Sequence, residues 1–209
     1  MKKVLFIGAH PDDIEIGCGG TIHKHRKEWD ITTITLCDKT LTNHCLKNYH
    51  YKSLSKLGVS KDKVILKSFD PSSLDHCRQL VWECFNKANN QINPELVFTH
   101  SRDDHQDHVT VYNETIRNFY ESSIVTYHIN RSQRTFDPNY YEILSKNNAK
   151  AKMLALKEYA PYQYSGQKKA SVKFCMYEKT VESQLRSNGV YLGKEYVEAF
   201  KIVKMINLD

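Results

Sequence analysis

The chain has 209 residues, of which 40% are hydrophobic and 26% are charged, and its net charge is +6. This length and composition suit one globular domain over residues 1–209 and exclude a disordered or fibrous chain. No apolar run approaches the roughly 18 residues needed to cross a bilayer, so we expect no transmembrane segment.

The first residues and the cysteines predict a cytoplasmic protein. "MKKVLFIGA" begins like a signal peptide, but its apolar part is too short, and His10 follows where a cleavage region would lie. The six cysteines show no CxxC pair and no disulfide-framework spacing, so we expect reduced thiols.

The positive charge is concentrated near the C-terminus. Residues 145–209 contain 12 Lys and Arg against 6 Asp and Glu, and the remaining residues sum to zero. Such a segment can attract an anionic substrate or partner, or it can simply be the solvated face of helices. It carries no nucleic-acid-binding motif, so we expect no nucleic-acid partner, and a homo-oligomer is compatible with the sequence.

Strand-like and helix-like patterns alternate along the chain. The first run, "KKVLFIGAH", is continuously apolar from Val4 to Ile7, as in a strand buried on both faces. By the same criteria, further strands are predicted at 30–38, 63–69, 94–100 and 123–129. Helices are predicted at 13–28, 45–58, 72–91, 107–120, 145–159 and 167–188. Periodicity leaves 198–206 open between strand and helix.

This alternation predicts an α/β fold, a Rossmann-like three-layer sandwich whose mostly parallel sheet has helices on both faces. In such sheets the functional site lies at the carboxyl ends of the strands. "AHPDD" follows the first strand and "HSRDDHQDH" follows the fourth. We therefore expect these two polar clusters to meet at one edge of the sheet.

The residues in the two clusters are typical of a hydrolytic metal site. His10, Asp13 and His108 supply the two nitrogens and one oxygen that such a divalent cation prefers. Asp12 would stay free as a general base for water activated by the metal. His105 lies one helical turn from His108, and Asp107 can orient or charge-stabilise an imidazole. Either cluster alone would be explained by an ordinary loop exposed to solvent. Only the combination of two such clusters, each at the end of a predicted strand, favours a metal site.

The glycines of "GCGG" (17–20) raise the alternative of a phosphate-binding loop. Phosphate-binding glycines follow the first strand directly, whereas here His10, Pro11 and two aspartates intervene. The carboxylates would repel a pyrophosphate, so the glycines are better explained by close packing of the first helix on the sheet.

These motifs resemble those of the LmbE/PIG-L family of zinc-dependent N-acetylglucosamine de-N-acetylases. "AHPDDIEIGCGGTI" is similar to its first motif and "PELVFTHSRDDHQDH" to its second, and weaker likeness continues in "KVILKSFDPSSL", "KMLALKEYAPYQ" and "GVYLGKEYVEAFKIV". The resemblance implies Zn²⁺, with Fe²⁺ or another divalent metal as alternatives, held by His10, Asp13 and His108. It also implies Asp12 as general base.

The resemblance further implies that His105 stabilises the oxyanion or acts as general acid, tuned by Asp107. Asp70, Asp103 and Tyr127 are candidates for substrate binding, although Tyr127 would equally suit the core. The family's usual Arg-x-x-Glu pattern before a leucine and a glycine is missing from "CLKNYHYKSLSKLG". This departure leaves the substrate open.

The residues and the resemblance leave three functions open. The first is removal of an acetyl group from an N-acetylated amino sugar or glycoconjugate, a small molecule that is anionic if it is nucleotide- or lipid-phosphate-linked. The second is cleavage of a different acyl amide at the same site. The third is a non-catalytic binding protein that uses the basic residues 145–209.

Overall fold

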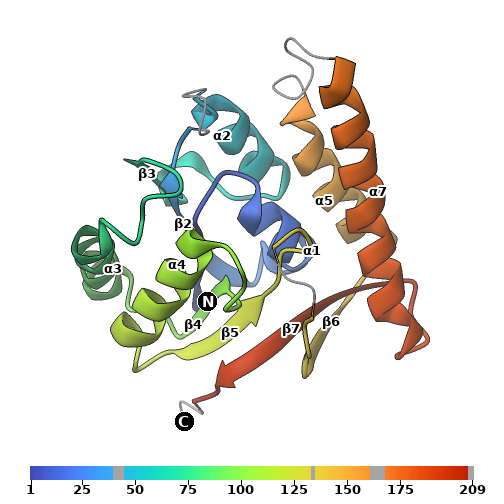
Figure 1. Cartoon of the computed structure of the whole chain (residues 1–209). Helices are drawn as coiled ribbons and strands as arrows, with labels where there is room; N and C mark the ends of the chain where they lie inside the picture. Colours follow the sequence, from blue (N-terminus) through green and yellow to red (C-terminus); the bar gives the residue numbers. More distant parts are fainter. Residues whose placement is uncertain (40–44, 133–134, 161–167, 207–209) are drawn as a thin grey trace.

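The computed structural model describes residues 1–39, 45–132, 135–160 and 168–206. Its centre is a seven-stranded sheet with the strand order β3-β2-β1-β4-β5-β7-β6 (Figure 1). The strands are β1 (Lys2–Gly8), β2 (Trp29–Cys37), β3 (Val64–Phe69), β4 (Leu96–His100), β5 (Ser123–Tyr127), β6 (Tyr140–Leu144) and β7 (Tyr196–Lys204). The helices are α1 (Asp13–His25), α2 (Lys47–Lys56), the 3₁₀ helix η1 (Lys61–Lys63), α3 (Arg78–Ile92), α4 (Gln106–Asn118), α5 (Lys146–Lys157) and α7 (Lys168–Val190).

Helices cover both faces of the sheet, because successive residues of a strand point to opposite sides. Val4 and Phe6 of β1 pack in one core cluster with Ile14 of α1. Leu5 and Ile7 pack in a second cluster with residues of α3 and α4. Figure 1 shows α1, α2 and α5 on one face and α3 and α4 on the other. The predicted three-layer α/β sandwich is confirmed.

Strands β1 to β5 pair in parallel, while β7 is antiparallel to both β5 and β6. The segment 198–206, left open by the sequence, is therefore strand as far as Lys204, and β6 was not predicted at all. "YYEIL" contains Glu142, whose charge argues against a buried strand until its partners Lys24, His25 and Tyr140 are known. The pairing that makes this segment a strand comes from β7, which lies more than 50 residues further along the chain.

Helix α1 packs closely on its neighbours through two glycines. A Cβ atom at Gly17 would lie 2.2 Å from the ring of Tyr127, and one at Gly20 would lie 2.2 Å from Leu144. Glu198 of β7 accepts hydrogen bonds from the backbone N–H of Gly20 at 2.8 Å and from Nζ of Lys152 at 2.6 Å. The glycines thus serve packing, as predicted from the sequence.

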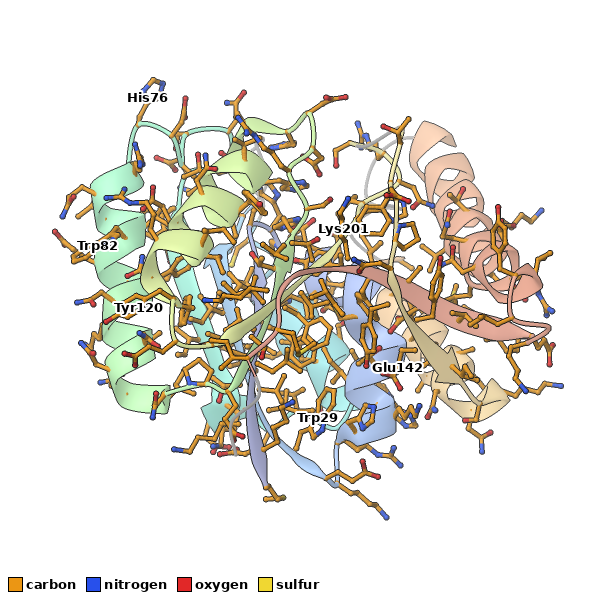
Figure 2. All side chains as sticks on the ribbon, turned by 90° about the horizontal axis from the view of Figure 1, so that it is seen from below. Trp29, His76, Trp82, Tyr120, Glu142 and Lys201 are labelled. Atoms are coloured by element: carbon orange, nitrogen blue, oxygen red, sulfur yellow. The ribbon has the colours of Figure 1, made fainter. Side chains whose placement is uncertain are left out.

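Helix α3 begins at Arg78, six residues later than predicted, because residues 70–77 form a turn with Ser72 at a φ of 61°. Side chains fill both interfaces between sheet and helices, whereas those of His76 and Tyr120 extend outward (Figure 2). None of the described helices is long and apolar enough to cross a membrane.

Candidate metal centre

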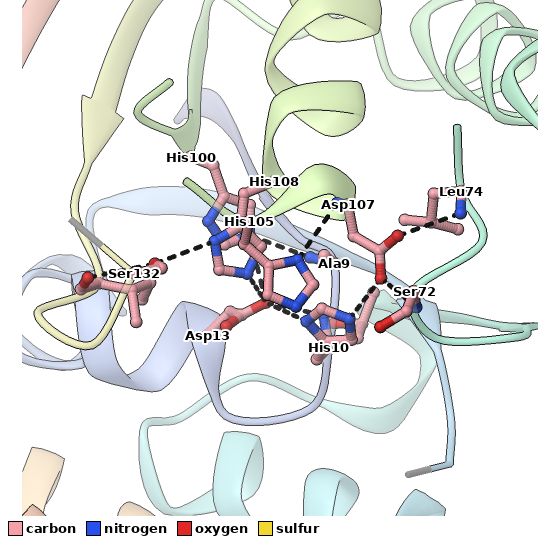
Figure 3. Close-up of polar contacts among 12 residues, drawn as sticks. Ala9, His10, Asp13, Ser72, Leu74, His100, His105, Asp107, His108 and Ser132 are labelled. Atoms are coloured by element: carbon pink, nitrogen blue, oxygen red, sulfur yellow. Dashed lines mark hydrogen bonds and ion pairs between the residues drawn. The ribbon is translucent and has the colours of Figure 1, made fainter. Parts of the chain in front are cut away.

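The turn after β1 and the loop after β4 meet at the carboxyl edge of the sheet, because β1 and β4 are paired neighbours. His10 and Asp13 come from the first segment, and His105 and His108 come from the second (Figure 3). The ring centroids of His10 and His108 are 5.5 Å apart, although 98 residues separate them in sequence. The structure thus brings the two polar clusters together.

His10, Asp13 and His108 each present a ligand atom within 4.8 Å of the others. Nε2 of His108 is buried, lies 3.6 Å from Oδ2 of Asp13, and has no hydrogen-bond partner among the described residues. Nδ1 of His10 lies 3.4 Å from the same Oδ2. The cluster thus offers two imidazole nitrogens and one carboxylate oxygen, and within the described residues no hydrogen bond occupies Nε2 of His108. This set of ligand atoms fits a divalent metal such as zinc or iron.

Each imidazole of this cluster is held from behind by a second carboxylate. Nε2 of His10 lies 2.8 Å from Oδ2 of Asp107, and Nδ1 of His108 lies 2.7 Å from Oδ2 of Asp103. Such outer carboxylates orient histidines that bind metals and raise their basicity. The candidate substrate residue Asp103 is thus placed behind His108, where it also accepts a hydrogen bond from Ser132 at 2.6 Å.

Nearby carboxylates stabilise the charged forms of His10 and His108. Burial lowers the pKa of His10, but hydrogen bonds to Asp107 and Asp13 outweigh burial and raise that pKa to about 10. Burial likewise lowers the pKa of His108, and the charge of Asp13 with the bond to Asp103 raises it to about 9. A pocket whose carboxylates stabilise cations in this way also suits a metal ion.

Asp12 lies beside this cluster in a conformation unusual for its residue type. Its φ is 95°, in the left-handed region, and its side chain makes no capping hydrogen bond to α1. Burial raises the pKa of its carboxyl group well above the ordinary value, assisted by the charges of Asp13 and Glu15. Strained residues of this kind cluster at functional sites, and a raised pKa suits a general base.

His105 precedes the first turn of α4, and its Nδ1 accepts a hydrogen bond from the backbone N–H of Asp107 at 3.2 Å. We therefore assign the ring proton to Nε2 in the neutral form. The carboxylate of Asp107 bonds His10 rather than His105. Burial and the charges of His108 and His10 lower the pKa of His105, which favours this neutral form.

The other two candidates for substrate binding are not among the candidate ligands, although the hydroxyl of Tyr127 lies 3.3 Å from Nε2 of His100. Tyr127 is fully buried and donates a hydrogen bond from its hydroxyl to the carbonyl of Ile7 at 2.7 Å, so the structure places it in the core. The side chain of Asp70 is 74% exposed and forms an ion pair with Lys39 at 2.7 Å.

Sequence reasoning assigned no role to His100, the last residue of β4. Its ring is fully buried and stacks on that of His108 with centroids 3.8 Å apart. Nε2 of His100 lies 3.2 Å from Oδ2 of Asp13. Burial and the nearby charge of His108 lower its pKa to about 4, so the ring is neutral. Its position at the carboxyl end of a parallel strand was the available signal.

A family model agrees with these observations. Residues 5–119 match the PIG-L family, described as GlcNAc-PI de-N-acetylase. The match spans more than half of the chain and contains both polar clusters. The chain belongs to this deacetylase family.

The chain is also similar to individual proteins in sequence and in fold. The chain is 26% identical over 169 residues to the uncharacterized deacetylase YaiS of Escherichia coli K12, covering 76% of this chain and 90% of YaiS. Its fold is similar to that of the conserved protein TT1542 from Thermus thermophilus, with a TM-score of 0.77, 20% identity and coverage of 100% and 98%. N,N'-diacetylchitobiose deacetylase from Pyrococcus horikoshii matches with a TM-score of 0.76, 21% identity and coverage of 97% and 84%. At these identities the two structures show a common fold.

Proposed function

We propose that this protein removes the acetyl group from an N-acetylated amino sugar or glycoconjugate, with Zn²⁺ held by His10, Asp13 and His108. The observation that carries the proposal is the buried Nε2 of His108, which lies beside Asp13 and His10 and has no hydrogen-bond partner in the described part of the chain. Membership in the PIG-L family supplies the class of reaction.

The roles of the residues follow from their positions. A zinc ion bound by this cluster would polarise water and the amide carbonyl. Asp12 takes the proton from the attacking water, because its raised pKa makes it a stronger base than an ordinary aspartate. The new C–O bond forms on the acetamide carbonyl carbon, and Nε2–H of His105 donates to the oxygen on which negative charge develops.

Breaking the C–N bond requires a proton on the departing nitrogen. Asp12 gives up the proton that it gained from water to this nitrogen, so that the products are acetate and a free amine, while the neutral His105 keeps its proton and only donates a hydrogen bond. Asp103 and Asp107 hold the two imidazoles of the cluster throughout these steps. The chain thus contains a base, a hydrogen-bond donor and a ligand set within one site.

The function is tested by a screen for acetate release with parallel metal analysis of the purified protein. The panel contains a free N-acetylhexosamine, a nucleotide-linked and a lipid-phosphate-linked N-acetylhexosamine, and amides of larger acids. We expect acetate from at least one sugar in the presence of zinc, and preference for a phosphate-linked sugar would assign a role to the basic residues 145–209. Release of larger acids without acetate would instead establish an amidase of different specificity.

A further inference from the structure

One carboxylate joins the candidate metal centre to the loop between β3 and α3. Asp107 is fully buried, and its Oδ2 lies 2.8 Å from Nε2 of His10. The same Oδ2 accepts a hydrogen bond from the backbone N–H of Ser72 at 2.6 Å. Its Oδ1 accepts one from the N–H of Leu74 at 3.1 Å (Figure 3).

Two residues at the start of α4 bind the backbone of Ser72, one at its carbonyl and one at its N–H. Gln106 donates from Nε2 to the carbonyl of Ser72 at 2.6 Å, while Asp107 accepts from its N–H. Ser72 has a φ of 61°, a conformation that residues other than glycine rarely adopt and that the surroundings must stabilise. The loop therefore depends on these contacts for its shape.

The loop also forms part of the surface beside the site. The Leu74 side chain is buried in the core, which anchors one end of the loop. Asp70 at the other end is exposed and pairs with Lys39. A movement at Ser72 would thus disturb its hydrogen bond to Asp107, the carboxylate that contacts His10.

We propose that Asp107 is a positioning residue that couples the 70–74 loop to His10, so that cation binding and the observed loop conformation stabilise each other. This inference rests on the proposed metal site. Nδ1 of His10 faces Asp13, and Nε2 faces Asp107. A cation that fixes the ring through Nδ1 therefore also fixes the carboxylate of Asp107, which contacts Nε2. Any effect of the cation on the loop must be matched by an equal effect of the loop on cation affinity.

Hydrogen–deuterium exchange of the 70–76 segment tests the coupling in the wild type and in Asp107→Ala, with and without zinc. In the wild type, we expect zinc to slow exchange at Ser72 and Leu74. In Asp107→Ala we expect these amides to exchange at least about tenfold faster and not to respond to zinc, because their acceptor is gone. Zinc affinity, measured by competition with a chromophoric chelator, should fall by about 10–100-fold.

Asp103→Ala is the matched control, because Asp103 holds His108 in the way that Asp107 holds His10 but bonds Ser132 instead of the loop. It should lower zinc affinity and leave exchange at 70–76 responsive to zinc. Equal effects of both variants on the loop, or a normal zinc response in Asp107→Ala, would overturn the proposal.

Two further measurements keep the test decisive. If Asp107→Ala does not fold, Asp107→Asn removes one of the two carboxylate acceptors with less disturbance and should give intermediate exchange rates. Coupling without any acetate release would leave this inference standing and reject the proposed function, whereas a wild type that binds no zinc would reject both the coupling and the proposed metal site.

Discussion

Asp12 and Asp13 are neighbours in the chain, yet their surroundings differ. Burial raises the pKa of both carboxyl groups, but at Asp13 the charge of His108 and the hydrogen bond with His10 outweigh burial and lower that pKa well below the ordinary value. At Asp12, burial and the charges of Asp13 and Glu15 outweigh the charges of His10 and His108, so its pKa is raised. The two environments thus shift the pKa values of the two carboxyl groups in opposite directions. We therefore assign them different roles, Asp13 as metal ligand and Asp12 as general base.

This difference predicts distinct phenotypes for two alanine variants. Asp12→Ala should retain zinc and lose turnover by about 10²–10⁴-fold, because it removes a general base and no ligand. Asp13→Ala should lose the metal itself. Metal content per protein and acetate release, measured on the same samples, check both outcomes, and undiminished turnover in a fully loaded Asp12→Ala would contradict the roles assigned.

At the scale of elements, a polar cluster joins the end of α1 to the edge strand β6. Glu142 of β6 bonds Lys24, lies 3.2 Å from Nε2 of His25, and accepts from the hydroxyl of Tyr140 at 2.6 Å. Nδ1 of His25 lies 3.0 Å from Glu28. Both nitrogens of His25 therefore face carboxylates, and its ring stacks on Trp29 with centroids 3.9 Å apart.

This cluster predicts a pH-dependent contribution to stability. Burial lowers the pKa of His25, but the hydrogen bonds to Glu142 and Glu28 outweigh it and raise the pKa in the folded state. A histidine with a raised pKa stabilises the fold fully below its unfolded pKa of about 6.5, and the effect is lost as the pH rises through the folded value. The free energy of unfolding of His25→Gln, compared with wild type, should therefore differ most in the acidic range.

Urea unfolding followed by fluorescence measures this difference between about pH 5.5 and about pH 8.5, a range that brackets the ordinary histidine pKa. His76→Gln is a suitable control, because it makes the same replacement at a side chain that is 83% exposed and lies outside this cluster. A difference between His25→Gln and wild type that grows with pH would contradict the prediction.

For the whole molecule, the strand order explains where the site lies. β1 is central, with β2 on one side and β4 on the other. The chain therefore continues from β1 to β2 and β3 on one side and then crosses to β4 on the other side. At such a switch point, the loops after neighbouring strands diverge and leave room for a ligand. The two clusters meet there because the sheet, rather than the local sequence, sets their separation.

A metal that bridges two segments so far apart in sequence should stabilise the whole fold. Binding at a concentration about 100 times the dissociation constant adds about 2.7 kcal/mol. For a chain of this size, this corresponds to a rise in Tm of about 5–11 °C. Differential scanning calorimetry should thus show a fall of that size on chelation in the wild type and none in Asp13→Ala, and an equal fall in both would exclude stabilisation through this site.

Local patterns in the chain were enough to predict the alternation of strands and helices and the residues that converge at the sheet edge. Continuous apolar and β-branched runs identified β1 to β5, and His10, Asp13 and His108 stand out because they follow two of these strands. The partners of these residues became known only from the folded molecule: Asp103 behind His108, Asp107 between His10 and the 70–74 loop, and His100 stacked within the site.

The folded molecule also made 140–144 a strand, because a charge such as Glu142 becomes compatible with a sheet only when Lys24 and His25 reach it. These contacts join groups more than a hundred residues apart, and β6 pairs with β7, which lies more than 50 residues further along the chain. Periodicity reports which side of an element is apolar, whereas the distance between two remote side chains depends on how the whole chain packs. No local pattern encodes that distance.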